Sequence, residues 1–206
     1  MEIVKGAGMS TLRVFAATSL SLLWTLPVGT IIGMNKKVRG FFQSIIQILS
    51  SIPATAFFPI LLMWCFRHNI TNLNLPAVVL MMLASQWYLL FNIIAGVSSI
   101  PDELQTTSSL LPLSRFQRYK TLFLPSIFPY LITGLITVYG GCWNASIIAE
   151  YSSFSGKTYS IKGLGSLIVK STSSGNYELL FASTLSMIII VVLLNRLLWR
   201  RLYKIA

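Results

Sequence analysis

The stretch from Ile100 to Pro125 reads IPDELQTTSSLLPLSRFQRYKTLFLP and separates two long apolar runs in a chain that carries little charge. Pro101 suits the first turn of a helix, and Asp102 and Glu103 place negative charge at the positive end of that helix. We expect this helix to run to about Leu111. The stretch therefore begins as a folded element and not as a flexible loop.

A second short helix is expected after a tight turn. Pro112 stops the first helix, because proline has no backbone N–H to donate. Ser114 and Gln117 then form a capping-box pattern, which is typical of a helix start. Apolar side chains gather at the turn: Leu110, Leu111 and Leu113. We predict a helix-turn-helix whose exposed leucines need a partner.

The rest of the chain is too apolar for a soluble domain. Of the 206 residues, 54% are hydrophobic and 10% are charged, and the mean hydropathy is +0.73. A run of roughly 20 apolar residues is long enough to cross the hydrocarbon layer. Such runs predict five transmembrane helices, at about 12–34, 41–66, 75–99, 122–149 and 178–199. We expect an all-α, multi-pass protein of the cell membrane, with one permeation domain over residues 1–206 and the hairpin at 100–121.

The formal charge of +11 does not indicate a nucleic-acid partner. The basic residues are scattered through the connections and form no basic helix face. The positive-inside tendency explains most of them if the hairpin and the C-terminus are cytoplasmic and the N-terminus is outside. The cations assigned to the cytoplasmic side are Lys36, Lys37, Arg39, Arg115, Arg118, Lys120, Arg196, Arg200, Arg201 and Lys204.

Polar side chains inside the apolar runs are candidates for a solute path. A lipid-facing stripe of amides would be costly, so these groups should either form hydrogen bonds between helices or line a water-filled path. The two roles can coincide. Glu150 closes the fourth run, and it is either a charge that snorkels to the interface or a gate or pathway residue. The candidate path residues are Gln47, Ser51, Gln86, Asn92, Asn144 and Glu150.

Several motifs that resemble catalytic or cofactor sites do not qualify as such. The triplet 156–158, Gly-Lys-Thr, resembles the end of a P-loop, but the position five residues before it is Tyr151 and not glycine. His68 is the only histidine, so a histidine-based metal site is not expected. Cys65 and Cys142 are single and lie in apolar runs, which favours buried small side chains. A membrane-embedded enzyme remains the alternative, with no metal and no cofactor expected on this chain.

At the hairpin the sequence resembles the permease subunits of ABC importers. The cytoplasmic EAA loop of that family has the pattern P-x-E-L-x-E-A-A, then a Gly, then L-P. The matching residues here are Pro101, Glu103, Leu104, Leu111, Ser114, Arg115, Leu124 and Pro125. The chain departs from the pattern where Thr106, Thr107 and Ser108 replace Glu-Ala-Ala and where Pro112 replaces the Gly.

A second block points to one branch of this family. The block YGGCWNASIIAEY, from Tyr139 to Tyr151, is followed by Gly163-Leu164-Gly165. It is similar to the branch that moves nitrate, sulfonates, taurine or related anions, and bicarbonate is a further candidate solute. A permease for a non-anionic solute stays an alternative. Because relatives often carry one more N-terminal helix or two fused units, 206 residues can be a minimal core or a truncated half.

The resemblance implies the type I importer permease fold and a set of partners. The hairpin would dock on a cytoplasmic ABC ATPase, which would bind the ATP and Mg. A second permease unit, in a homodimer or a fused pseudo-dimer, would complete the path, and an extracellular or periplasmic solute-binding protein would deliver the solute. The residues implied in coupling are Glu103, Leu104, Thr107, Ser108, Leu110, Leu111, Pro112, Leu113, Ser114 and Arg115.

Overall fold

Long helices dominate the structure, because a hydrocarbon layer offers the backbone no other hydrogen-bond partner. The computed structural model describes residues 1–154 and 156–203, without the Arg115 side chain, so Lys204 lies outside the described residues. The elements in chain order are α1 (Glu2–Met34), α2 (Lys36–Ser51), η1 (Ala54–Phe57), α3 (Phe58–Arg67), α4 (Asn74–Ser98), α5 (Asp102–Leu110), α6 (Arg115–Arg118), η2 (Tyr119–Phe123), α7 (Leu124–Glu150), β1 (Tyr151–Phe154), β2 (Lys157–Ser160), α8 (Leu164–Ser174), α9 (Tyr177–Leu194), η3 (Asn195–Trp199) and α10 (Arg200–Tyr203).

The described residues contain four helices that are long and apolar enough to cross a membrane, or five spans if one bent helix pair counts as a span. The four are Glu2–Met34, Asn74–Ser98, Phe116–Glu150 and Tyr177–Tyr203. The bent pair joins Lys36–Ser51 to Ala54–Arg67 at an angle of 71°. The predicted all-α membrane fold is confirmed.

Helix α4 forms the centre of the bundle and packs against both α1 and α7. Small residues allow this close approach, because a Cβ atom placed on Gly33 of α1 would lie 2.6 Å from the Cβ of Val97. At a second contact of α4, a Cβ atom on Gly134 of α7 would lie 2.8 Å from Leu89 Cδ1. Glycines at both contacts therefore bring three spans together.

The second predicted span is not a single helix. We expected one helix over residues 41–66, but α2 ends at Ser51 and α3 starts at Phe58. Pro53 explains the break, since a proline disfavours helical geometry in the residue before it. Ile52 is accordingly extended, with φ −76° and ψ 125°. Pro59 is tolerated because it lies in the first turn of α3.

Two further segments differ from the expectation. Helix α1 begins at Glu2 and not near residue 12, so the first helix has 33 residues. The segment after α7 was expected to be a loop with a small interfacial helix. It forms an antiparallel hairpin of β1 and β2, with Tyr151 opposite Ser160, followed by the 11-residue helix α8. Gly156 permits the tight turn between the strands with its positive φ of 73°.

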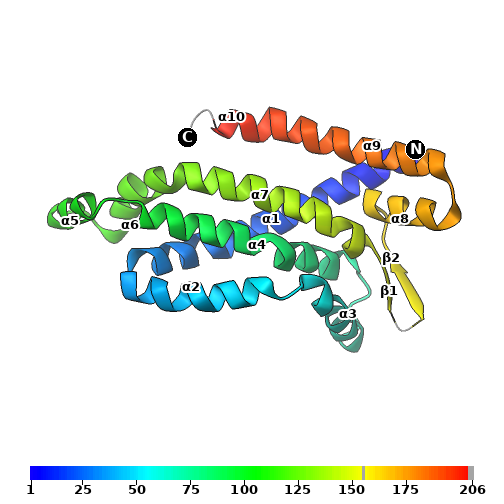
Figure 1. Cartoon of the computed structure of the whole chain (residues 1–206), viewed down its shortest axis with the longest axis horizontal. Coiled ribbons are helices and arrows are strands. Elements are labelled where there is room, and N and C mark those ends of the chain that lie inside the picture. Colours follow the sequence, from blue (N-terminus) through cyan, green and yellow to red (C-terminus); the bar gives the residue numbers. More distant parts are fainter. Residues whose placement is uncertain (155, 204–206) are drawn as a thin grey trace.

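The two ends of the bundle carry different structures. Helices α5 and α6 lie at one end of the long axis, and the β-hairpin, α8 and the N-terminus lie at the other end (Figure 1). A continuous helical segment of 35 residues, Phe116–Glu150, connects the two ends and contains α7. This segment contains the π-turn η2 (Tyr119–Phe123) just before Pro125. Pro125 has no backbone N–H to donate, so the regular α-helical hydrogen-bond pattern is interrupted there.

The substitution Gly33→Ala tests whether the α1–α4 contact depends on glycine. The added methyl would overlap Val97, and overpacking of this kind typically destabilises a protein by about 1–3 kcal/mol. Gly8→Ala in the same helix is the control, because a Cβ atom there would meet nothing within 4 Å. Thermal unfolding in detergent should give a lower midpoint for Gly33→Ala only. Equal midpoints for the two variants would contradict the packing described here.

Candidate functional site

The hairpin between α4 and α7 folds as the sequence predicts. Helix α5 spans Asp102–Leu110, and α6 starts at Arg115. The capping box forms, because Ser114 N donates to Gln117 Oε1 at 2.8 Å and Gln117 N donates to Ser114 Oγ at 3.2 Å. The predicted helix-turn-helix is therefore confirmed, with a defined start for its second helix.

Arg118 joins the two helices of the hairpin. Its Nε donates to Ser108 Oγ at 2.7 Å, and its Nη2 donates to the carbonyl oxygen of Gln105 at 2.7 Å. Ser108 is buried as a result, with 9% of its surface exposed. Sequence reasoning placed Arg118 only among the topology cations. The contact joins residues on two helices, and no local pattern reports such a pair.

The tip of the hairpin exposes a group of apolar side chains. Leu110 is 81% exposed and Phe116 is 75% exposed. Sequence reasoning missed Phe116, although it follows the cap residue Ser114 by only two positions. The apolar tip consists of Leu104, Leu110, Leu111, Leu113 and Phe116. Glu103, Thr107, Pro112 and Ser114 are also exposed, whereas the side chain of Arg115 lies outside the described part of the chain.

A polar face runs along α7 and continues onto α4. Asn144 is exposed on α7, at helical spacing from two exposed threonines, Thr133 and Thr137. On α4, Tyr88 is 49% exposed. The two helices meet here, because a Cβ atom on Gly134 would lie 3.1 Å from Asn92 Cβ. The polar face therefore consists of Tyr88, Asn92, Thr133, Thr137 and Asn144.

The other candidate path residues lie elsewhere. Gln47 and Ser51 are exposed on α2. Gln86 is buried within the bundle and accepts a hydrogen bond from Trp24 Nε1 at 2.9 Å. Gln86 thus fills the interhelical bonding role, which was one of the two alternatives for these groups. A role of any of these residues in solute passage stays a prediction.

Glu150 is fully buried and makes an ion pair that the sequence analysis missed. Its Oε1 accepts from Arg13 Nη1 at 2.8 Å and from Ser10 Oγ at 2.6 Å, and its Oε2 accepts from Gly165 N at 2.8 Å. Because the exposed fraction of Glu150 is 0%, the snorkelling alternative is wrong. An arginine inside the first predicted span was the available signal, since a charge there needs a buried partner.

The remaining polar groups around this pair are also satisfied. Arg13 Nε donates to Asn74 Oδ1 and Arg13 Nη2 donates to the carbonyl oxygen of Lys162, both at 2.7 Å. Leu164 N donates to Ser10 Oγ at 2.9 Å. We call Ser10, Arg13, Asn74 and Glu150 the buried ion-pair cluster. It joins α1, the start of α4, the end of α7 and the first turn of α8.

The glycines that precede and begin α8 are required by this contact. A Cβ atom on Gly163 would overlap the carboxylate of Glu150. A Cβ atom on Gly165 would lie 2.7 Å from the carbonyl oxygen of Ser146. The Gly163-Leu164-Gly165 motif thus lets the N-terminus of α8 approach α7 closely enough for the carboxylate to cap it.

Comparison with known families and proteins gives one family and several relatives. Residues 25–203 match the family described as "Binding-protein-dependent transport system inner membrane component". A nitrate import permease protein of Synechococcus elongatus is 30% identical over 150 residues, which cover 71% of this chain and 52% of the relative. A taurine transport system permease protein of Escherichia coli is 28% identical over 141 residues, which cover 68% of this chain and 50% of the relative.

A bicarbonate transport system permease protein of Synechococcus elongatus is also similar, with 28% identity over 141 residues. The aligned part covers 68% of this chain and 49% of that protein. The chain thus spans about half the length of the curated relatives it matches.

Solved transporters share the fold. A chain of the MetNI methionine ABC transporter, in an inward-facing conformation, matches with a TM-score of 0.75 and 19% identity, over 98% of this chain and 94% of that one. A chain of an amino acid ABC transporter with histidines matches with a TM-score of 0.69 and 13% identity, over 100% of this chain and 94% of that one. The predicted importer permease fold is confirmed.

Neutralising Glu150 tests the buried ion-pair cluster. Glu150→Gln leaves Arg13 as a buried charge without a counter-charge, and breaking a buried pair in this way costs about 3–5 kcal/mol of unfolding free energy. The double variant Arg13→Gln with Glu150→Gln should recover part of this loss, because no unpaired charge remains. Denaturant unfolding in detergent measures both.

The exposed pair of Lys36 and Asp102 is the matched control for this experiment. Its atoms are 2.7 Å apart, but the two side chains are 71% and 72% exposed. Exposed pairs contribute about 0–1 kcal/mol, so Asp102→Asn should change stability little. If Glu150→Gln were as mild as Asp102→Asn, the cluster would not be a major constraint on the fold.

Removing the Arg118 side chain should loosen the hairpin without unfolding the spans. Arg118→Ala leaves the Gln105 carbonyl and the Ser108 hydroxyl without their cationic donor, and such hydrogen bonds contribute about 1.5–3 kcal/mol. Amides of α5 should then exchange with deuterium roughly tenfold faster or more, while those of α4 keep their protection. Lys120→Ala, which removes an exposed cation nearby, should leave α5 protected. Unchanged exchange in Arg118→Ala would show that the two helices are held by other contacts.

Proposed function

Because the chain belongs to the family of binding-protein-dependent transport system inner membrane components, as its sequence predicted, we propose that it is a permease subunit of an ATP-driven ABC importer. The family consists of transport components and not of enzymes, and the chain is a membrane protein with several spanning helices. In this proposal the chain supplies the solute path and binds no cofactor. ATP and Mg are bound by a separate ATPase.

The exposed apolar tip of the hairpin carries the proposal of an ATPase partner. Leu110 is 81% exposed and Phe116 is 75% exposed, so the tip offers an apolar group that is free to enter a groove on another protein. The Arg118 contacts make the hairpin one stiff unit. Because Phe116–Glu150 is a continuous helix, a force applied at the hairpin acts directly on a membrane span.

A second permease unit is the proposed partner for the polar face. The face lies on the surface of this chain, where Tyr88 is half-exposed and Asn144 is exposed. Two such surfaces facing each other would enclose a path lined by amides and hydroxyls. Gln47 and Ser51 on α2 are further candidates for its lining. Alternating exposure of this path to the two sides of the membrane would follow ATP binding and hydrolysis.

A small anion is the proposed solute. The similar proteins are named for the transport of nitrate, bicarbonate and taurine, each of which carries an anionic group. Neutral amides and hydroxyls suit transient passage of an anion better than tight storage, so affinity would reside in an external solute-binding protein. A non-anionic solute is the alternative, because the same fold occurs in the MetNI methionine ABC transporter and in an amino acid ABC transporter with histidines.

The variant Leu110→Arg tests the coupling role of the hairpin. A charge buried in an ATPase groove without a partner should weaken ATPase binding on the order of a hundredfold or more. Co-purification with the ATPase and uptake of labelled nitrate, bicarbonate or taurine should be lost together. Leu111→Ala, which removes apolar contacts only, should have a smaller effect, and Glu103→Ala the smallest.

Two controls accompany this experiment. Leu110→Met keeps an apolar side chain of similar volume at the tip and should retain ATPase binding. Phe154→Arg introduces the same charge at the other end of the bundle and should leave ATPase binding unchanged. Wild-type uptake by Leu110→Arg with the ATPase still bound would mean that this hairpin is not the coupling element. Saturable uptake of a neutral or cationic solute alone would contradict the anion class while leaving the permease role intact.

A further inference from the structure

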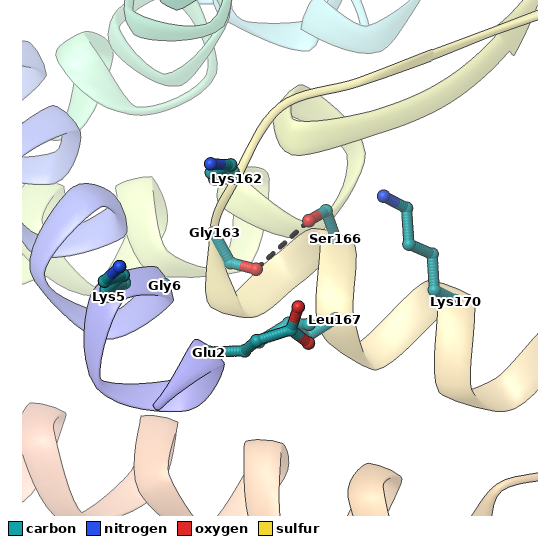
Figure 2. Close-up of a pocket in the computed structure, with 8 residues that line it drawn as sticks. All are labelled: Glu2, Lys5, Gly6, Lys162, Gly163, Ser166, Leu167 and Lys170. Atoms are coloured by element: carbon teal, nitrogen blue, oxygen red, sulfur yellow. Dashed lines mark hydrogen bonds between the residues drawn. The ribbon is translucent and has the colours of Figure 1, made fainter.

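A cavity lies at the end of the bundle opposite the hairpin, between the start of α1 and α8. Its volume is about 390 Å³. Figure 2 shows Lys5 on α1, Lys162 in the segment before α8 and Lys170 on α8, all bordering this cavity. Leu167 and Gly6 contribute apolar surface to its wall. The proposed transport path does not include this cavity.

The cavity has an excess of positive charge. Its three lysines are accompanied by one carboxylate, that of Glu2. The ion pairs within the described residues are Arg13–Glu150 and Lys36–Asp102, so no lysine of the cavity has a paired carboxylate there. Ammonium groups of this kind attract phosphate as point charges. The cavity therefore favours an anionic ligand that comes from outside the described chain.

The walls of the cavity are held in place by buried contacts. Arg13 of α1 donates to the carbonyl oxygen of Lys162, and Ser10 of α1 accepts from Leu164 N. A Cβ atom on Gly6 would lie 3.2 Å from the carbonyl carbon of Gly163, so α1 and the segment before α8 are in contact beside the cavity. These contacts hold α1 against the segment that carries Lys162, and such preorganisation lowers the entropic cost of binding a ligand.

An exposed apolar stripe on α1 continues from the cavity along the span. Lys5 lies on the same helix face as Met9, Leu12, Leu20 and Leu23, which follow it by four, seven, 15 and 18 positions. All four of these side chains are apolar, and Leu12 is 66% exposed and Leu23 is 71% exposed. The apolar stripe consists of Met9, Leu12, Leu20 and Leu23. Cationic groups at one end of an apolar stripe match the two parts of a phospholipid.

We propose that this cavity binds the phosphate headgroup of an anionic phospholipid, with an acyl chain along the apolar stripe of α1. A free soluble anion would use the lysines and not the stripe. An acidic protein surface would likewise gain nothing from apolar side chains that extend over four helical turns into the span. The proposal concerns a lipid site at the membrane interface, and it stands whether or not the chain is a permease.

Lipid titration of the purified protein tests the proposal directly. The probes are phosphatidylglycerol, phosphatidylcholine with the same acyl chains, and water-soluble glycerol phosphate, each titrated into the detergent-solubilised protein and followed by native mass spectrometry. We expect phosphatidylglycerol to bind most tightly. The triple variant Lys5→Gln, Lys162→Gln and Lys170→Gln should lose affinity for it on the order of a hundredfold, since each lysine near an anionic headgroup contributes roughly a factor of five.

Matched variants separate the parts of the site. The triple variant Lys37→Gln, Lys120→Gln and Lys157→Gln removes the same charge at exposed positions elsewhere and should bind phosphatidylglycerol as the wild type does. The variant Leu12→Ala with Leu23→Ala should weaken phosphatidylglycerol several-fold by removing apolar contact, without affecting glycerol phosphate. Gel filtration of each variant confirms that it is folded.

Several results would overturn the proposal. Equal binding of phosphatidylglycerol and phosphatidylcholine would mean that the headgroup charge is not recognised. Glycerol phosphate binding as tightly as phosphatidylglycerol would make this a site for a free anion. Loss of self-association or of a protein partner in the lysine variant, with phosphatidylglycerol binding intact, would assign the cavity to a protein contact. None of these outcomes depends on solute uptake, so they leave the proposed transport role untouched.

Discussion

The buried pair of Arg13 and Glu150 is the contact on which one whole end of the bundle depends. Charges inside a membrane protein are tolerated only where every polar atom finds a partner. Here the carboxylate takes donors from Arg13, Ser10 and Gly165, and Arg13 in turn reaches α4 and the segment before α8. Four separate segments thus have to meet in one arrangement. The glycines at 163 and 165 permit the close approach that this arrangement requires, and the cavity lies beside it.

An arginine also organises the opposite end, but there the contact leaves apolar surface exposed. Arg118 satisfies groups on α5 while Leu110 and its neighbours remain uncovered. One continuous helical segment joins the two ends, since Phe116 lies in α6 of the hairpin and the segment from Phe116 ends at Glu150. A displacement of the hairpin cannot be absorbed by a loop before it reaches the buried ion-pair cluster. The fold therefore links an exposed apolar surface to a region fixed by buried charge.

The sequence was informative wherever the determining contacts are local. Pro101, Pro112 and the capping box of Ser114 and Gln117 act within a few residues of their own position, and they predicted the hairpin. Apolar length predicted the spans for the same reason. The bend at Ile52 was missed, although its cause, Pro53, is local. In a membrane span, prolines are often tolerated, so the pattern alone does not distinguish a kink from a break.

The candidate sites were less predictable, because their contacts join distant parts of the chain. Arg13 and Glu150 are 137 positions apart, and neither residue identifies the other in a single sequence. The contact of Arg118 with Ser108 is closer in sequence but depends on the angle between two helices. Glu150 was correctly singled out as unusual, yet its partners decide what it does. A charge pattern shows where a partner is required and not which residue supplies it.

The side chains of the polar face on α4 and α7 differ in whether this chain satisfies their hydrogen bonds. Thr133 and Thr137 bond to carbonyl oxygens of their own helix, so their hydroxyls tolerate a lipid environment. Asn92 likewise donates to the carbonyl oxygen of Tyr88. Asn144 is exposed, and its amide makes no hydrogen bond to the residues that the structure describes. An amide at membrane depth requires water or another protein, because hydrocarbon offers it no partner. In the proposed importer, a second permease unit across a hydrated path would supply this partner.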